Sequence, residues 1–543
     1  MMKIKKMSLP LKVFLILGVF MLLTAWVINP LLKHLLATQI ENKLVGNFFY
    51  GYENLKVDLI SRSVTFEKVN WKFPKDTSVF NQSGFINRFK IDGVSILSLV
   101  GGSNVRIDNI IFDSLVLLTR IERFSKKDSL PDSEPFNFYS LIRGQIPGVG
   151  ITTIKIKNGN ATWLDPENKR IWGKINRVQL SVNSFNLDSA TAAANNGWFS
   201  FQNFLLEGVT GELYLADSLH KIQTSKIQLD YKNHKVIIDS LKLIPLFTKS
   251  QMRYKRRYET NRIELSAPRV TITGIDVKRL MVKNELRIGK VLINQLILST
   301  FRDKSPPLNP HHFSLLPQLT LLRAGLNLKI DSVCLKDALI EYEELSKKTQ
   351  KVGKVFFEKI NAELSNITND SISYQQNTRA TLKISTQFMG ISKLAVQVVF
   401  NLPDPNGDHW IKGTLGTLDL TALNTVFEPL TAVSIRSGLL DQLNFNVRLN
   451  NDVSDGQVTF LYSNLKIDKL NEKHLQDHDF DNSLKSLLAN TFLIKKSNPS
   501  GDRDPRIGTI HYKRVKEKAI FNFWLKSVLD GMSSTVLNVD ESM

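Results

Sequence analysis

Apolar and polar residues alternate with a period of two over most of this 543-residue chain, so strands rather than helices are expected. Val, Ile, Leu, Phe, Tyr and Thr recur between Asn, Asp and Gly residues, which favour turns. Residues 55–73 are typical and predict two strands joined by a turn near Ser61 and Arg62. Successive side chains of a strand point to opposite faces, so each predicted strand has one apolar and one polar face.

A sheet of this kind must hide its apolar face from water. It can pack against a second sheet, close into a barrel, or curl into a groove whose lining is filled by an apolar ligand. Alternation alone does not choose among these arrangements. A packed double sheet would favour a structural role, and an apolar lining open at one end would favour lipid binding.

A weak repeat runs through the alternating sequence. Four segments share one order of apolar and polar positions: IDNIIFDSLVLLT from Ile107, ITTIKIKNGNATW from Ile151, IGKVLINQLILST from Ile288 and IDSVCLKDALIEY from Ile330. Their apolar pairs coincide at Ile110/Phe112, Ile154/Ile156, Val291/Ile293 and Val333/Leu335. A polar or small pair follows in each copy, and then a second apolar stretch. We therefore expect a repeated unit of strand, tight turn and strand.

The chain begins with a basic tail and then its longest apolar run. Four lysines within residues 1–12 precede the run Val13–Ile28, and leucines extend it on both sides. With these flanks the run reaches the length of a membrane-spanning helix, and the excess of lysine before it predicts a cytoplasmic N-terminus. The alternatives are a buried core helix and a cleaved signal peptide, but Trp26, Asn29 and Pro30 stand where cleavage needs small residues.

These patterns divide the chain into consecutive parts. They are a cytoplasmic basic tail (1–12), a transmembrane anchor (13–32), a helical stem (33–45), a repeated β-strand groove domain (46–470) and a closing segment with helices and final strands (471–543). Loops are predicted at residues 125–135, 303–312, 402–408 and 496–505, which are polar and contain proline. A short helix and turn are expected within residues 137–150, and a longer helix within residues 471–493.

Residues 518–532, KAIFNFWLKSVLDGM, predict an amphipathic helix near the C-terminus. Asn522, Lys526 and Asp530 form one polar stripe at four-residue spacing, and apolar residues cover most of the remaining surface. Gly531 is expected to cap the C-terminal end of this helix. Two interpretations stay open: a core helix packed on the sheet, or a helix that touches a membrane or closes the end of an apolar groove.

Charge and cysteine content limit the partners and the compartment. The net charge of +20 favours anionic partners such as phospholipid headgroups, acidic glycolipids or nucleic acid, although an excess of lysine also keeps proteins soluble. An anchored, exported chain does not meet nucleic acid, so lipid is the expected partner. Cys334 is the single cysteine, which excludes an intramolecular disulfide and fits a bacterial envelope protein held together by its sheet.

Signals for catalysis are weak, and we assign no catalytic, cofactor-binding or metal-ligating residue. The chain has no P-loop, no G-x-S-x-G, no H-E-x-x-H and no dinucleotide-binding fingerprint. One group has metal-ligand side chains but is interpreted as the charged start of a helix: His474, Asp477, His478, Asp479 and Asp481. His311 and His312 are a metal candidate in a proline-rich loop. The basic run RYKRRY, residues 253–258, is interpreted as an exposed loop or as a site for anionic headgroups.

Both ends of the chain resemble the AsmA-like family of bacterial envelope proteins. At the N-terminal end, the anchor is followed by GYENLKVDLISRSVTFEKVNW and GFINRFKIDGVSILSLVGGSNVRIDNIIFDSLVLL. At the other end, DGQVTFLYSNLKIDKL and GTIHYKRVKEKAIFNFWLKSVLDGM are similar to the closing strands and terminal amphipathic helix of that family. The middle of the chain shares with that family only the alternation of apolar and polar residues. The resemblance implies an elongated, curled antiparallel β-sheet groove of the bridge-like lipid-transfer type, without catalytic residues.

From the anchor and the resemblance we expect a single-pass inner-membrane protein with a cytoplasmic N-terminus and a periplasmic bulk. It is expected to bind or conduct phospholipid or another envelope lipid, to support outer-membrane biogenesis, and to be neither an enzyme nor a cofactor carrier. The alternative is an assembly scaffold that binds other envelope proteins. An exported glycan hydrolase would need paired carboxylates in a cleft, and the sequence places none. The chain is shorter than the large members of that family. The resemblance therefore does not imply that it spans the periplasm and bridges both membranes.

Overall fold

The computed structural model describes residues 49–72, 81–95, 98, 103–120, 137–144, 146–164, 170–431, 433–469 and 494–537. The predicted tail, anchor and stem, the loop at 125–135 and the helix at 471–493 lie outside the described residues. None of the helices in the described ranges has the length and apolar character needed to span a membrane. The chain divides into two compact units, residues 1–214 with 224–233 and residues 215–223 with 234–543, called unit 1 and unit 2.

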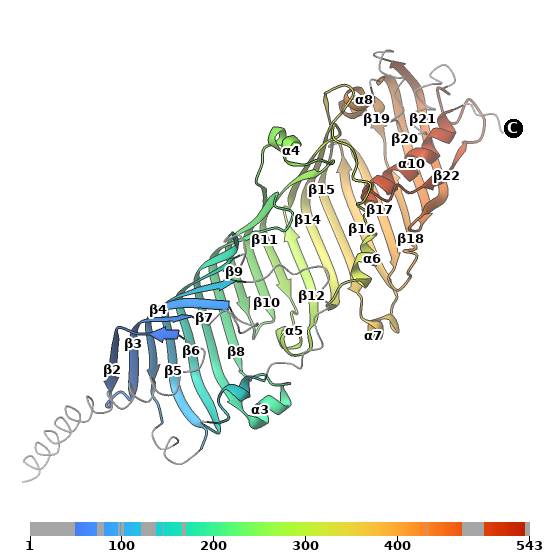
Figure 1. The fold of residues 1–543 in the computed structure, drawn as a ribbon. Helices are drawn as coiled ribbons and strands as arrows, with labels where there is room; N and C mark the ends of the chain where they lie inside the picture. Colours follow the sequence, from blue (N-terminus) through green and yellow to red (C-terminus); the bar gives the residue numbers. More distant parts are fainter. Residues whose placement is uncertain are drawn as a thin grey trace, which may run out of the picture. The chain divides into compact units, whose positions relative to one another are not determined.

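Unit 1 is a β-sheet with short helical segments (Figure 1). Its strands are β1 (Phe49–Gly51), β2 (Asn54–Asp58), β3 (Ser63–Lys72), β4 (Asn81–Asp92), β5 (Val105–Arg120), β6 (Gly148–Leu164), β7 (Ile171–Asp188) and β8 (Asn203–Tyr214). Its helical segments are η1 (Phe138–Leu141) and α3 (Ser189–Ala194), and strand β9 (His220–Asp230) has residues in both units. The two strands and the turn predicted within residues 55–73 are confirmed as β2, residues 59–62 and β3.

Unit 2 is also built on a β-sheet. Its strands are β10 (Lys235–Pro245), β11 (Asn261–Thr273), β12 (Glu285–Asn294), β13 (Ile297–Asp303), β14 (Asn327–Leu345), β15 (Val352–Thr368), β16 (Arg379–Phe388), β17 (Ser392–Asn401), β18 (His409–Leu415), β19 (Leu418–Asp419), β20 (Val433–Leu449), β21 (Val453–Lys469) and β22 (Ile507–Lys513). Its helices are α4 (Lys249–Lys255), α5 (Val277–Lys283), α6 (Pro317–Leu322), α7 (Ser371–Tyr374), η2 (Leu420–Leu423), α8 (Asn424–Thr431) and α10 (Ile520–Val536). The loops predicted at 402–408 and 496–505 fall between these elements, and so does the loop predicted at 303–312 except for its first residue, Asp303, which ends β13.

Both sheets are mixed, so the prediction of a purely antiparallel sheet was wrong. Strand β5 runs parallel to β6 in unit 1, and β12 and β13 both run parallel to β14 in unit 2. The other registered strand pairs are antiparallel, as for β3, β4 and β5. Parallel neighbours need a crossover of a dozen residues or more. The chain supplies such crossovers at residues 121–147 and 304–326.

The repeat copies pair with each other, and the sequence alignment matches the register of the strands. Ile107 lies opposite Ile151 in the first parallel pair, and Ile288 lies opposite Ile330 in the second. The aligned apolar positions also pair: Ile110 with Ile154, Phe112 with Ile156, Val291 with Val333, and Ile293 with Leu335. The repeated β unit is therefore confirmed as a feature of both sheets.

The tight turn expected inside each copy is replaced by a bulge. One residue with positive φ stands seven positions after the first isoleucine of each copy: Ser114 (57°), Asn158 (54°), Gln295 (52°) and Asp337 (53°). The chain then continues in the same direction, because a single left-handed residue makes a β-bulge without reversing the strand. Lys68, Arg177 and Thr210 add positive-φ residues on β3, β7 and β8. The bulges of neighbouring strands form a crease across each sheet.

Candidate functional site

The candidate site in unit 1 is the apolar face of its sheet. Two rows of register partners cross the sheet from β3 to β8. The first row is Val64, Ile91, Ile110, Ile154, Val182 and Phe204, and the second is Phe66, Phe89, Phe112, Ile156, Leu180 and Leu206. Every member of both rows is half-buried, so each keeps part of its apolar surface accessible with all described elements in place.

Aromatic rings reinforce the second row. The centroids of Phe66 and Phe89 are 5.9 Å apart, and those of Phe89 and Phe112 are 5.0 Å apart. Tyr52 adds an edge-to-face contact with Phe66 at 5.5 Å. Ring pairs at these separations contribute attraction beyond simple burial of area. These contacting rings give the sheet a continuous apolar surface from β3 to β5.

The opposite face of the same sheet is polar and carries ion pairs. Lys56 contacts Glu67 at 2.6 Å, Arg88 contacts Asp113 at 3.4 Å, and Lys174 contacts Glu212 at 3.3 Å. Exposed pairs of this kind add about 1 kcal/mol or less to stability. They do show which face is solvated, and so they distinguish the two faces of unit 1.

A group of aromatic residues borders the apolar face near β7 and β8. It comprises Phe138, Phe185, Trp198, Phe199, Phe201, Phe204 and Tyr231, whose contacting rings have centroids 4.8 to 6.1 Å apart. Phe204 belongs both to this group and to the first apolar row. This aromatic group was not predicted from the sequence, although the run WFSFQNF from Trp198 is a visible signal for it.

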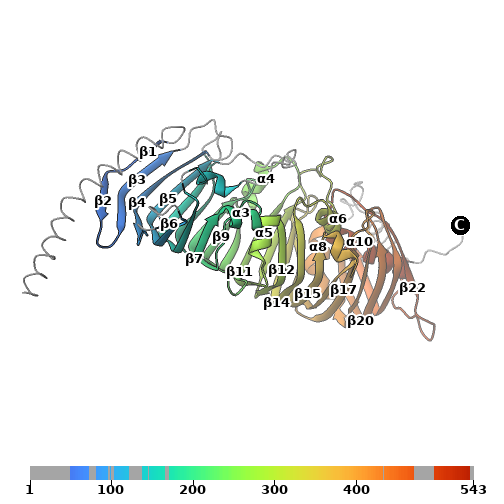
Figure 2. The ribbon, with the colours of Figure 1, turned by 90° about the horizontal axis from the view of Figure 1, so that it is seen from below.

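The apolar face of unit 2 is half-buried along the middle of its central row and fully buried from β17 to β20. Its central row is Val236, Ile272, Val291, Val333, Leu364, Leu382, Val398, Ile411 and Val447. Val236, at the start of the row, is 8% exposed and Ile272 to Leu382 are half-buried, whereas Val398, Ile411 and Val447 are 0%, 4% and 1% exposed. Residues of α6 and α10 share one core with the last three, and Figure 2 shows both helices beside β17.

Helix α10 confirms the predicted amphipathic helix and shows it packed on the sheet. The role expected for Gly531 was wrong, because this residue lies inside α10 rather than at its end. A Cβ on Gly531 would lie 2.7 Å from both Ile510 and Val458, so the helix touches the sheet there. Phe523 and Trp524 are buried, whereas Phe521 and Leu525 remain exposed.

A buried polar group joins β18 to both covering helices. The indole Nε1 of Trp524 donates to Nε2 of His409 at 3.0 Å, which leaves the ring proton on Nδ1 to donate to the Gly407 carbonyl at 2.9 Å. Gln318 of α6 donates to the same carbonyl at 2.7 Å. Burial lowers the pKa of His409 to about 4, so the ring is neutral at neutral pH.

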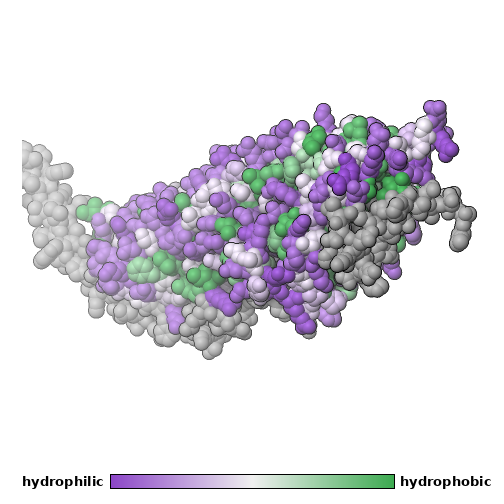
Figure 3. Space-filling view, turned by 90° about the horizontal axis from the view of Figure 1, so that it is seen from above, coloured by the Kyte–Doolittle hydropathy of each residue, from purple (hydrophilic) through white to green (hydrophobic). Residues whose placement is uncertain are grey.

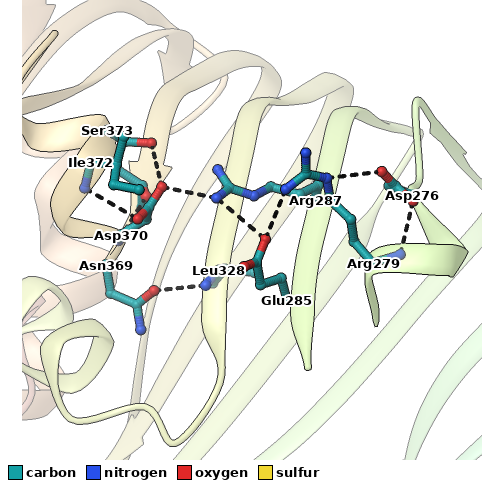
Figure 4. Close-up of polar contacts among 10 residues, drawn as sticks. Asp276, Arg279, Glu285, Arg287, Leu328, Asn369, Asp370, Ile372 and Ser373 are labelled. Carbon is teal, nitrogen blue, oxygen red and sulfur yellow. Dashed lines mark hydrogen bonds and ion pairs between the residues drawn. The ribbon is translucent and has the colours of Figure 1, made fainter. Parts of the chain in front are cut away.

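A network of ion pairs ties α5 and α7 to the first residues of strand β12 (Figure 4). Arg287 of β12 contacts Asp370 at 2.9 Å and Glu285 at 3.7 Å, and Arg279 of α5 contacts Glu285 at 3.0 Å. Burial alone would raise the pKa of Asp370, but hydrogen bonds from Ser373 and Arg287 outweigh it and hold the pKa below its usual value. The network has a structural role, because its arginines pair with carboxylates of the same group.

A cavity of about 90 Å³ opens over β20 and β21 of unit 2. Leu423 and Phe427 form one wall, Phe460 lies in the floor, and Leu529 and Lys526 of α10 form the other wall. Its lining comes from segments far apart in the sequence, so no local motif pointed to it. Figure 3 shows hydrophobic residues at the surface in separate patches among hydrophilic ones.

The residues singled out from the sequence are not brought together into a metal or catalytic site. His311 and His312 are exposed in their loop, and the described ranges contain no group of three or more His, Cys, Asp or Glu residues that could hold a metal. The group at residues 474–481 lies outside the described residues. Cys334 is buried in β14.

The basic run at 253–258 is not simply an exposed loop, because its first residues belong to helix α4. Thr248 begins that helix with a capping box. Arg253 contacts Asp303 at 3.4 Å, and Lys255 lies 5.1 Å from the ring centroid of Phe247. Arg257 lies 5.5 Å from the ring centroid of Tyr258. These cations interact with groups of the same unit.

Neither a protein-family model nor a curated protein matches the chain. The resemblance of its two ends to the AsmA-like family is therefore a hypothesis. The faces of the two sheets and the cavity beside α10 are the basis for the function proposed below.

Proposed function

We propose that the chain is a non-enzymatic, AsmA-like envelope protein whose sheet forms an elongated, curled groove that binds and conducts lipid. Residues 13–32 would anchor it in the inner membrane, with the groove in the periplasm, where it would support outer-membrane biogenesis. The observation that carries the proposal is the apolar face of unit 1, whose two rows stay half-buried across six strands.

An acyl chain is the occupant that suits this face. It has no polar groups along its length, so it would cover apolar side chains without leaving hydrogen-bonding groups unpaired. Each methylene group moved from water onto an apolar surface gains about 0.8 kcal/mol. A face of this kind would therefore remove much of the cost of a lipid leaving a bilayer. The net charge of +20 favours an anionic headgroup.

Unit 2 supports the proposal through the change in exposure along its apolar row. The half-buried part from Ile272 to Leu382 resembles the face of unit 1, and the part from Val398 to Val447 is closed by α6 and α10. An apolar face open along one part and closed at one end is what a lipid groove with a defined terminus requires. The closed part also favours the second candidate, an assembly scaffold that binds envelope proteins.

The decisive measurement is the phospholipid that co-purifies with the full chain after extraction in mild detergent, quantified by mass spectrometry. Ile110→Glu places a charge in the first apolar row and should lower the amount of bound lipid. Ile111→Glu is the matched control, because Ile111 is also half-buried but pairs with Lys90 and Lys155 on the polar face. Lipid-free wild-type protein that crosslinks to a stable protein partner would contradict the proposal and favour the scaffold.

A further inference from the structure

The crossover between β13 and β14 contacts parts of unit 2 that are far from those two strands in the sequence. In the segment between β22 and α10, the carbonyl of Lys516 accepts the backbone N–H of Ser314 at 2.8 Å. The crossover then forms α6, whose Gln318 donates to the Gly407 carbonyl in the loop between β17 and β18. Residues 308–320, called the lid, therefore contact the part of the sheet that α10 also covers.

The chain is fixed on both sides of the lid, next to the ends of β11 and β15. Before the lid, the backbone N–H of Glu259 donates to the Pro307 carbonyl at 2.9 Å. After the lid, the side-chain amide of Asn369 donates to the carbonyls of Leu321 and Leu326 at 3.2 and 2.9 Å. A segment that is fixed at both ends can swing about them as one unit.

Few apolar side chains hold the lid on the sheet. Leu316 and Leu319 are 0% and 6% exposed, and they belong to the same core as Val398 of β17. A Cβ on Gly407 would lie 2.7 Å from Leu316, so this glycine is a close-fitting seat for the lid. Residues 308–315 are half-buried or exposed. A segment with so few buried apolar contacts opens at a lower cost in free energy than the strands beneath it.

The other contact of the lid is made by Arg514, whose side chain is only 5% exposed. In the described part of the chain its guanidinium donates to two neutral acceptors, the Ser314 carbonyl of the lid and Oδ1 of Asn451. It also lies 5.9 Å from the ring centroid of Phe523. Burial lowers the pKa of Arg514, and Asp452 opposes this effect. Closing the lid over this side chain therefore withdraws a charge from water, which costs free energy.

Two polar atoms at the lid contacts add to this cost. The Nε–H of Arg514 and Oε1 of Gln318 are buried, and neither has a hydrogen-bond partner among the described residues. Buried polar groups without partners destabilise the state in which they are buried. Both atoms become accessible to water when the lid lifts. The closed lid is therefore separated from an open state by much less free energy than unfolding of the sheet requires.

We propose that residues 308–320 are a hinged lid that opens while α10 stays on the sheet, and that the lid controls access to the buried end of the apolar face in unit 2. The proposal goes beyond the proposed function, because opening of the lid does not depend on which ligand the face binds. The two covering segments then have different roles. Helix α10 is a fixed part of the core, with buried residues along its whole length from Ile520 to Val536, and the lid is the part that moves.

The test is hydrogen–deuterium exchange of the full chain in mild detergent, with the peptides resolved by mass spectrometry. Leu319→Ala weakens the apolar contact of the lid, and His312→Ala, at an exposed position of the lid, is its control. Gly407→Ala changes the seat, and Gly501→Ala is its control. These two glycines have φ of 71° and 62°, but a Cβ on Gly501 meets nothing within 4 Å.

We expect Leu319→Ala to increase exchange across residues 308–320 by about ten-fold or more, because loss of a buried leucine side chain shifts an equilibrium by at least this much. Gly407→Ala should act in the same direction, and neither control should change the exchange of the lid. Peptides of α10 should exchange as in the wild type in all four variants. Circular dichroism checks the fold, and either test variant is sufficient if the other does not fold.

A reversible crosslink tests the lid without weakening its contacts. In a Cys334→Ala background, Ser314→Cys and Lys516→Cys place the only two cysteines of the chain where the two backbones touch. We expect the oxidised protein to exchange several-fold more slowly than the reduced protein in the peptide that covers α6. Reduction of the disulfide should restore the faster exchange.

An equal rise of exchange in the lid and in α10 would overturn the proposal, because the two segments would then open together. Unchanged exchange of residues 308–320 in both Leu319→Ala and Gly407→Ala would also overturn it. The same conclusion would follow if the oxidised and reduced double-cysteine proteins exchanged at equal rates in α6.

Discussion

The Asp530 carboxylate of α10 accepts a hydrogen bond of 2.9 Å from the backbone N–H of His511 in β22. One turn later, the Ser534 hydroxyl accepts the backbone N–H of Thr509 at 3.1 Å. In a paired strand, alternate backbone N–H groups point away from the neighbouring strand. Strand β22 pairs with β21, so these N–H groups of β22 point away from β21. The C-terminal helix therefore satisfies donors of β22 that would otherwise attract another strand.

Removing both acceptors should expose this edge. The double variant Asp530→Ala and Ser534→Ala leaves the exposed N–H groups of His511 and Thr509 without their side-chain partners, so each becomes free to pair with another strand; each lost hydrogen bond costs about 0.5–1.5 kcal/mol. We expect concentration-dependent self-association, measured by analytical ultracentrifugation. Asn522→Ala, on the same polar stripe of α10, should stay in the wild-type state. A double variant that sediments like the wild type would show that this edge is protected in another way.

The close contact at Gly531 gives a second prediction. Alanine favours a helix interior over glycine by about 1 kcal/mol. Here its Cβ would lie 2.7 Å from Ile510 and Val458, so the helix must move away from the sheet. We expect Gly531→Ala to lower the thermal midpoint and to increase proteolysis of the C-terminal segment. Gly325→Ala is the control, because a Cβ there meets nothing within 4 Å. A raised midpoint for Gly531→Ala would contradict the close packing.

The buried His409 predicts a dependence of stability on pH. Burial lowers its folded-state pKa to about 4, an effect that Arg514 reinforces and that Asp408 and the Gly407 carbonyl oppose. The unfolded chain has a histidine pKa near 6.5, so it binds the proton first as the pH falls. Stability should therefore be constant above about pH 7 and decline between about pH 6.5 and pH 4, by roughly 2 kcal/mol at pH 5.

Denaturant unfolding at pH 7 and pH 5 measures this loss. His409→Gln should remove most of the difference between the two pH values, although it lowers stability at both by breaking the contact with Trp524. His311→Gln, at an exposed position, should keep the wild-type difference. An unchanged difference in His409→Gln would assign the pH dependence to other groups.

Sequence patterns were informative where structure depends on local periodicity. The alternation in residues 55–73 correctly predicts the two strands and the turn. The alignment of the repeats matches the residues that lie opposite each other in the parallel strand pairs. The direction of those ladders could not be predicted, because alternation is the same for parallel and antiparallel strands. It is decided by the long crossovers at residues 121–147 and 304–326.

Features that depend on tertiary packing were not accessible from the sequence. The helical pattern before Gly531 predicts a cap at this residue, whereas its actual role depends on contacts with Ile510 and Val458. The cavity beside α10 joins residues near 423, 460 and 529, whose proximity no local motif encodes. The crease is visible in the sequence at one place. Phe112 and Leu115 are both apolar but lie three positions apart, whereas strict alternation would separate them by an even number of residues. A shift of one residue in the alternation is the expected signature of a bulge.

The bulge residue Gln295 offers a direct test of the crease. Its φ of 52° costs a side-chain-bearing residue about 1–2 kcal/mol, which glycine does not incur. Gln295→Gly should therefore raise the free energy of unfolding by about 1 kcal/mol, measured by chemical denaturation. The neighbouring Asn294 is also exposed but ends the regular strand β12, so Asn294→Gly should lower stability by about 0.5–1 kcal/mol. Opposite signs for two adjacent glycine substitutions are expected only if the left-handed bulge lies at Gln295. Destabilisation by both would mean that the strand continues without a bulge through this position.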